Sequence, residues 1–94
     1  MTLNDVYTLL ESKPFYEEEK MNKFTFADNS IHIDRRALIP FSIYKENEDF
    51  FLAPDTAITS EKELRIEIEN GEKELIHFYG KTSGKKLLTL NEYR

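Results

Sequence analysis

The sequence predicts an α+β fold in which an N-terminal helix, about residues 2–12, precedes a curved antiparallel β-meander, about residues 23–91. Two observations carry this prediction. Only residues 2–12 keep a helical apolar period, and from Lys23 onward short β-rich runs alternate with turn residues. We expect about six or seven strands, arranged either as an open curved sheet or as a small barrel whose open end or face the helix covers. The 94 residues are enough for one domain and too few for two, so 1–94 is taken as a single domain.

The predicted helix begins with a capping signal. Thr2 is followed three residues later by Asp5, which resembles a capping box with Asp in place of Glu. Apolar residues then recur at positions i, i+3, i+4 and i+7. They are Leu3, Val6, Tyr7 and Leu10. Pro14 disfavours helical geometry in the residue before it, so the helix should end near Ser12.

The region from Lys23 to Ile43 is predicted to form three strands. Asp28-Asn29 suits a two-residue hairpin turn between the first two, which brings two apolar pairs to one face. These pairs are Phe24 with Ile33 and Phe26 with Ile31. The third strand contains Pro40, which cannot donate a hydrogen bond, so this strand should be bent, bulged or at an edge. The charged residues 16–20 are expected to form a solvated connector before the first strand.

The remaining strands are expected at residues 50–53, 64–69, 75–79 and 86–91. Between 64 and 79, apolar and charged residues alternate around Asn70-Gly71, which is a common hairpin turn. We expect a three-residue loop over 69–71. That loop places Ile76 and Phe78 on the main apolar face and leaves His77 off it.

Such a meander resembles lipocalin-like domains in general shape, and the resemblance implies an alternative function, the binding of a small apolar ligand inside the curved sheet. Aromatic side chains would line that site. They are Phe24, Phe26, Phe41, Phe51, Phe78 and Tyr79. The Gly-x-Trp signature of lipocalins is missing, since the sequence contains no Trp.

The composition indicates a soluble cytoplasmic protein. It has no cysteine for disulfides or thiolate zinc sites, and its beginning lacks the basic region and long apolar run of a signal peptide. No apolar stretch is long enough for a membrane span. The charge is unevenly placed: 1–78 carry 17 acidic and 9 basic residues, whereas 79–94 carry 4 basic and 1 acidic residue. A basic partner surface would be attracted to most of the chain.

The stretch from Gly80 to Lys86 raises the question of a phosphate-binding loop, because it contains Gly-Lys-Thr. A Walker-type loop also needs a glycine five residues earlier, where this sequence has Leu75, and a helix must follow. A strand is predicted instead. We therefore interpret Gly80-Lys81-Thr82 as part of a turn between strands.

No pattern in the sequence points to catalysis, a cofactor or a metal, and we expect a non-enzymatic protein. The chain has no cysteine nucleophile and no Gly-x-Ser-x-Gly elbow. His32 and Asp34 would need His77, from another strand, to complete a set of metal ligands, which is a weak signal. The many glutamates of residues 61–74 are typical of a solvated strand face.

Two charged clusters are the candidate partner-binding residues. The acidic cluster combines carboxylates with an aromatic residue, a combination that can attract a basic partner and then anchor it; its members are Glu46, Glu48, Asp49, Phe50 and Asp55. The basic cluster lies beside Tyr79 and comprises Lys81, Lys85 and Lys86. Lysines next to aromatic residues also suit contact with single-stranded nucleic acid.

From small size, acidity and the lack of catalytic motifs, we expect an interaction protein. It would be an inhibitor that occludes a basic or nucleic-acid-binding surface of a larger protein or ribonucleoprotein, as phage antidefence, anti-CRISPR-like and immunity proteins do. If the partner is a ribonucleoprotein, the basic cluster can contact RNA directly, although the acidity of the rest of the chain argues against nucleic-acid binding. The sequence leaves the oligomeric state open.

The interpretation of Gly80-Lys81-Thr82 as a turn can be tested with nucleotides. ATP or GTP with magnesium should leave the melting temperature unchanged, since a ligand stabilises only a state that it binds. Differential scanning fluorimetry is the measurement. An increase of several degrees that Lys81→Ala abolishes would contradict this interpretation.

Overall fold

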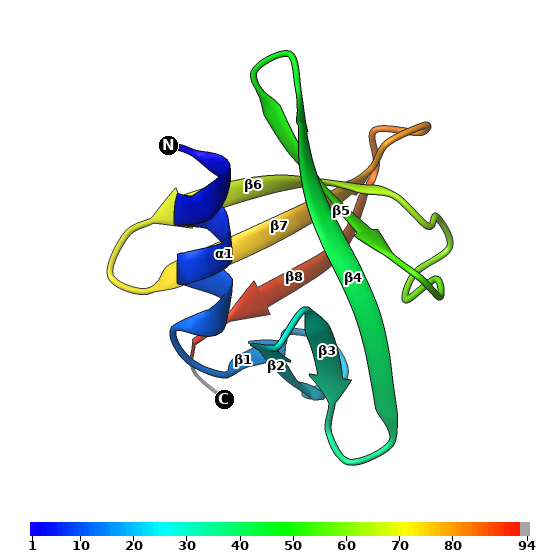
Figure 1. Ribbon diagram of the computed structural model, residues 1–94. Coiled ribbons are helices and arrows are strands. Elements are labelled where there is room, and N and C mark those ends of the chain that lie inside the picture. Colours follow the sequence, from blue (N-terminus) through cyan, green and yellow to red (C-terminus); the bar gives the residue numbers. More distant parts are fainter. Residues whose placement is uncertain (93–94) are drawn as a thin grey trace.

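A computed structural model shows a short helix followed by eight antiparallel strands that close into a barrel in sequence order (Figure 1). This architecture confirms the predicted fold class and decides between the open sheet and the barrel, although the strands number eight instead of the six or seven expected. The structure describes residues 1–92. Arg94, counted above in the basic C-terminal segment, lies outside the described residues.

The elements follow one another along the chain with short connections. They are α1 (Leu3–Glu11), β1 (Phe15–Glu17), β2 (Lys23–Ala27), β3 (Ser30–Ile33), β4 (Ala37–Glu46), β5 (Asp49–Pro54), β6 (Leu64–Asn70), β7 (Glu74–Gly80) and β8 (Lys86–Asn91). The longest connection between two strands, residues 55–63, joins β5 to β6.

The helix α1 has the predicted ends. At its start the backbone N–H of Thr2 donates to the Asp5 carboxylate at 2.7 Å and the Asp5 N–H donates to the Thr2 hydroxyl at 3.2 Å, which completes a capping box. Ser12 is the C-cap residue. Val6 and Leu10 are fully buried in the barrel core, so one face of α1 closes over the strands.

A hydrogen bond fixes the helix against the wall of the barrel. The Tyr7 hydroxyl accepts from the backbone N–H of Ile43 on β4 at 2.9 Å. The Tyr7 ring stacks on Phe41 with a centroid distance of 6.0 Å. Because Phe41 points inward, the helix contacts the interior of the barrel and also its β4 wall.

The expectation that residues 16–20 form a solvated connector was wrong for the first two of them. β1 pairs with β2 on one side and with β8 on the other, and so it closes the barrel. Its Phe15 is fully buried. Lys13, just before β1, holds this segment in place through ion pairs to Glu74 at 2.7 Å and Glu92 at 2.6 Å.

The β2–β3 hairpin has the predicted register. Asp28 and Asn29 have φ angles of 52° and 59°, as a tight two-residue hairpin turn requires. Phe24 pairs with Ile33 and Phe26 with Ile31, as expected. Pro40 lies where β4 changes neighbours: β4 pairs with β3 up to this residue and with β5 from the next. The missing N–H therefore falls at a junction between two ladders, and Figure 1 shows β4 as a long, bent strand.

The β6–β7 hairpin has the predicted face but a different loop. Ile76 and Phe78 pair with Ile68 and Ile66, and His77 points to the other side of the sheet, as expected. The loop is residues 71–73, two positions later than the predicted 69–71, because Asn70 still pairs with Glu74. The longer strands add paired residues, and this gain outweighs the local preference of Asn-Gly for the turn.

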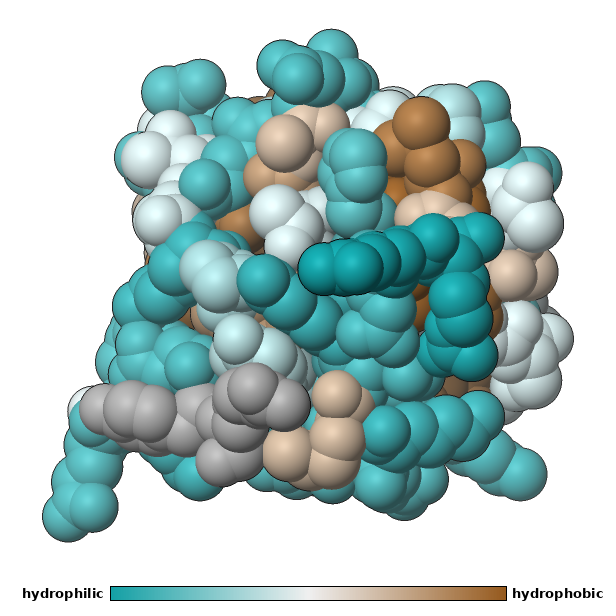
Figure 2. Space-filling view, turned by 90° about the horizontal axis from the view of Figure 1, so that it is seen from below, coloured by the Kyte–Doolittle hydropathy of each residue, from teal (hydrophilic) through white to brown (hydrophobic). Residues whose placement is uncertain are grey.

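The interior of the barrel is filled by inward side chains from all the strands. The buried cluster comprises Val6, Leu10, Phe15, Phe24, Phe26, Ile31, Phe41, Ile43, Leu52, Leu64, Ile66, Ile76, Phe78, Leu88 and Leu90. Phe26 and Phe41 meet edge to face with centroids 5.5 Å apart. On the outside, hydrophilic residues dominate the face in Figure 2. Among the exposed large hydrophobic residues, Leu38 on β4 is 62% exposed.

The buried position of Phe15 predicts that closure of the barrel contributes strongly to stability. Phe15→Ala should lower the free energy of unfolding by about 3–5 kcal/mol, because it removes a fully buried ring. Leu38→Ala is the control, and it should change stability by at most about 0.5 kcal/mol. Urea denaturation measures both. Equal effects of the two variants would contradict the assignment of Phe15 as part of the core.

Candidate functional site

The β4–β5 hairpin carries three exposed carboxylates at its end. Glu46 and Asp49 face each other across the ladder and flank the turn Asn47-Glu48, where Asn47 has a φ of 58°. Figure 1 shows this turn extending beyond the rest of the barrel. We call Glu46, Glu48 and Asp49 the acidic tip.

Asp55, the other predicted acidic residue, does not belong to the acidic tip. It follows the opposite end of β5, where its backbone N–H donates to the Pro40 carbonyl at 2.8 Å. Along an extended strand, the six residue steps from Asp49 to Asp55 correspond to about 20 Å. The structure therefore separates Asp55 from the acidic tip.

Phe50 and Phe51 point to opposite sides of β5. Phe50 is half-buried, pairs with Ile66 and packs against the core cluster. Phe51 is on the outer side, where its ring stacks on Tyr44 with centroids 5.2 Å apart and planes at 15°. It is nevertheless only 7% exposed. The predicted aromatic partner of the acidic cluster, Phe50, is thus part of the barrel packing.

Lys81 covers this outer aromatic pair. Its ammonium nitrogen lies 5.1 Å from the ring centroids of both Tyr44 and Phe51. The same nitrogen donates to the Tyr44 hydroxyl at 2.8 Å and to Glu46 at 3.3 Å, and it lies 3.5 Å from Glu63. The bond to Tyr44, followed by the bond to Glu46, raises the pKa of Lys81.

The Tyr44 hydroxyl is a link between Lys81 and Glu63. It donates to the Glu63 carboxylate, and this bond lowers the pKa of Glu63. Burial, followed by the same bond to Glu63, raises the pKa of the Tyr44 hydroxyl. Both shifts favour the state in which the phenol keeps its proton and the carboxylate its charge.

The acidic and basic clusters, separate in the sequence, therefore meet at one place. Lys81 pairs with Glu46, whereas Glu48 and Asp49 have no cation within ion-pair distance in residues 1–92. Lys85 and Lys86 are also exposed, but Lys86 begins β8 and lies opposite Tyr79. Two of the three acidic-tip carboxylates thus remain uncompensated.

A row of aromatic and cationic side chains crosses the outside of the barrel beside the acidic tip. Tyr44, Phe51, Arg65 and Tyr79 face one another in register on β4, β5, β6 and β7. The Arg65 guanidinium carbon lies 4.6 Å from the Tyr79 ring centroid. This row was not predicted from the sequence. In the sequence, the four residues occupy outward positions of strands with alternating polarity. Their alignment across the sheet can be recognised only when the register of the strands is known.

The turn that resembles a phosphate-binding loop holds a carboxylate of the protein itself. Glu61 accepts from the backbone N–H of Thr82 at 2.8 Å, from the Ser83 N–H at 3.3 Å and from the Ser83 hydroxyl. A side chain at Gly80 would overlap this carboxylate. The glycine thus makes room for Glu61, and the bond from Ser83, followed by that from Thr82, lowers the pKa of Glu61.

The two histidines lie apart. His32 is on β3 and His77 on β7, four strands away in a ring of eight, so they do not join in one site. His77 is largely buried between Glu69 at 2.9 Å and Thr89 at 3.2 Å. In residues 1–92 no group of His, Asp and Glu side chains is arranged to hold a metal ion.

No helix in residues 1–92 has the length and apolar character needed to cross a bilayer.

No family model, curated protein or solved structure matches the chain.

The Glu61 contacts predict a pH-dependent contribution to stability. The pKa of Glu61 is lowered from the ordinary value of 4.5, so its bonds stabilise the fold above that pH, and the contribution is lost as the pH falls through the lower pKa of the folded state. Glu61→Gln should therefore lower the melting temperature at pH 7 by more than at pH 3. Glu72→Gln, at an exposed loop position, is the control. An equal loss at both pH values would contradict a role for the Glu61 charge.

Proposed function

We propose that this protein is a small non-enzymatic inhibitor that binds a basic surface of a larger protein or ribonucleoprotein through its acidic tip. The observation that carries the proposal is the pair Glu48 and Asp49, two exposed carboxylates at the end of a projecting hairpin that have no cation within ion-pair distance among residues 1–92. Charges in such a position accelerate encounter with an oppositely charged surface.

The fixed surroundings of the acidic tip support this role. The Tyr44–Phe51 stack forms the outer side of the hairpin next to the acidic tip. Lys81 and Glu63 contact this stack and hold it in place. A rigid hairpin loses little conformational freedom on binding, so more of the interaction free energy remains as affinity. Glu46, already paired with Lys81, contributes less to attraction than the two unpaired carboxylates.

The filled interior favours this function over the binding of an apolar ligand. Four of the six aromatic residues that would line a ligand cavity pack together in the core, and the other two, Phe51 and Tyr79, point outward. A ligand inside the barrel would have to displace side chains that are already close-packed.

An affinity pull-down from the native host tests the proposal with three immobilised proteins. They are the native protein, the variant Glu48→Lys/Asp49→Lys and a control variant, Glu11→Lys/Glu72→Lys. The two variants change the net charge equally, at exposed positions in every case. We leave Glu46 unchanged so that its ion pair with Lys81 stays intact.

The native protein and the control should capture the same basic protein, read by mass spectrometry, and the tip variant should capture roughly tenfold less at low ionic strength. The difference should diminish as salt screens the charges. Nuclease treatment of the lysate distinguishes a direct protein contact from one bridged by nucleic acid. Unchanged capture by the tip variant would remove the acidic tip from the binding site.

A further inference from the structure

The barrel is incompletely paired where its first and last strands meet. β1 pairs with β8 only through Tyr16 with Asn91 and Glu17 with Leu90. One further bond runs from the Glu18 N–H to the Thr89 carbonyl at 3.1 Å. On this side of β8, residues 86–88 therefore have no partner strand in the described part of the chain.

The pairing of β1 with β8 ends early because the chain turns away from β8 after β1. The Glu17 N–H donates to the Asn22 carbonyl and the Met21 N–H to the Glu17 carbonyl, both at 2.9 Å. Met21 has a φ of 60°, which tightens this turn. The chain then enters β2, and the edge of β8 is left uncovered.

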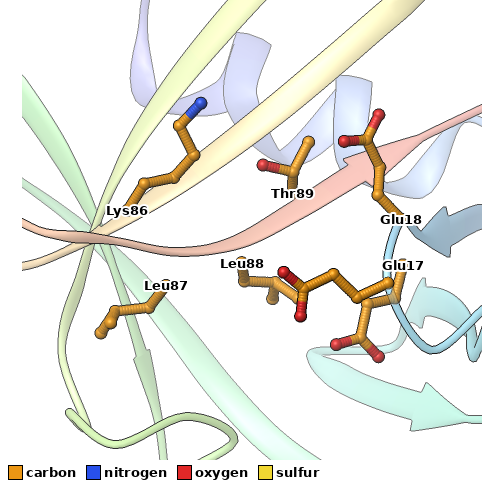
Figure 3. A pocket seen from close by; sticks show the side chains of 7 residues that line it. Glu17, Glu18, Lys86, Leu87, Leu88 and Thr89 are labelled. Carbon is orange, nitrogen blue, oxygen red and sulfur yellow. The ribbon is translucent and has the colours of Figure 1, made fainter.

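Two adjoining hollows of about 210 and 310 Å³ lie along this edge. They share Glu17, Glu19, Leu87 and Leu88, and we call them together the seam groove. Figure 3 shows the first hollow, with Glu18 on the side of β8 to which Lys86 and Thr89 point and Glu17 on the side of the two leucines. The second hollow adds an apolar floor from three different segments, formed by Phe24, Ile33 and Ile58.

A bulge in β8 turns two consecutive leucines toward the groove. The pairs Phe78 with Leu88 and Tyr79 with Lys86 leave Leu87 as the extra residue of the β7–β8 ladder. Leu87 and Leu88 point to one side of β8, whereas Lys86 and Thr89 point to the other (Figure 3). Leu87 has no counterpart on β7 and is half-buried at the groove.

The rim of the seam groove is acidic on the β1 side. Glu17 and Glu18 accept from the side-chain amides of Asn22 at 3.0 Å and Asn91 at 3.3 Å, which holds both carboxylates at the groove without neutralising them. Glu19 is exposed beside them. The three carboxylates outnumber the two lysines at the groove, Lys20 and Lys86.

We propose that the seam groove binds an extended, basic segment of a partner protein, which adds to the free edge of β8 as a further strand. An unpaired strand edge supplies backbone donors and acceptors for such β-augmentation. Alternate side chains of the segment would contact the apolar floor, and the others, on the opposite side of β8, would place their cations against Glu18. Residues 86–88 span about 10 Å, enough for three or four residues of the segment.

This binding site is independent of the acidic tip. In a ring of eight strands, the β8–β1 boundary lies four boundaries away from β4–β5, on the opposite side of the barrel. A folded basic surface at the tip and an extended segment in the seam groove can therefore be tested separately.

A fluorescein-labelled peptide of alternating lysine and valine, (Lys-Val)₄, is the probe. It should bind the native protein saturably in fluorescence anisotropy, and amide hydrogen exchange, followed by NMR, should slow at residues 86–88 of the native protein. Glu18→Lys should weaken binding by roughly fivefold, within the range of an exposed charge contact, whereas Glu72→Lys should leave it unchanged. A (Glu-Val)₄ peptide should not bind.

Three results would overturn the proposal: no saturable binding, binding without slower exchange at residues 86–88, or equal weakening by Glu18→Lys and Glu72→Lys. Weakening by Glu48→Lys/Asp49→Lys alone would place the peptide at the acidic tip, which excludes the seam groove and leaves the proposed function intact. The exchange measurement uses the native protein, so it decides the question even if a variant fails to fold.

Discussion

The whole structure depends on the pairing of the three-residue strand β1 with both β2 and β8. This pairing turns a meander into a closed barrel, and closure gives every strand an inner and an outer side. The inner side is filled by one apolar cluster that includes Phe15 of β1 and two residues of the helix. The outer side carries the charges. Without β1, the sheet would have two free edges and the core would be open to water at the gap.

Much of the fold could be predicted because local chemistry and the global fold agree. The Thr2 capping box and the Asp28-Asn29 turn are local signals, and the structure has both. The strand β1 could not be recognised because three residues are too few to display a period. The β6–β7 loop was misplaced because the paired isoleucines, rather than Asn70-Gly71, determine the register.

The candidate site was less predictable than the fold because its contacts join residues far apart in sequence. Lys81 and Glu46 are 35 residues apart, and as separate clusters they suggested two opposite surfaces. In the barrel they neutralise each other, which leaves Glu48 and Asp49 as the charges of the tip that have no ion pair within residues 1–92. Glu61 and Ser83 likewise meet only in the folded protein. A sequence pattern gives the residue types of such a site but not which charges cancel.

Closure also has a consequence for how the chain folds. Seven of the eight strand pairings join neighbours in sequence, so most of the barrel can form hairpin by hairpin at a low cost in loop entropy. The exception brings together Glu18 and Asn91, 73 residues apart, and it rests on a few bonds. We expect this junction to form late and to open first in local unfolding. Brief openings would then lengthen the free edge of β8. The last step of folding and the entry of a partner segment would therefore take place at the same boundary between β1 and β8.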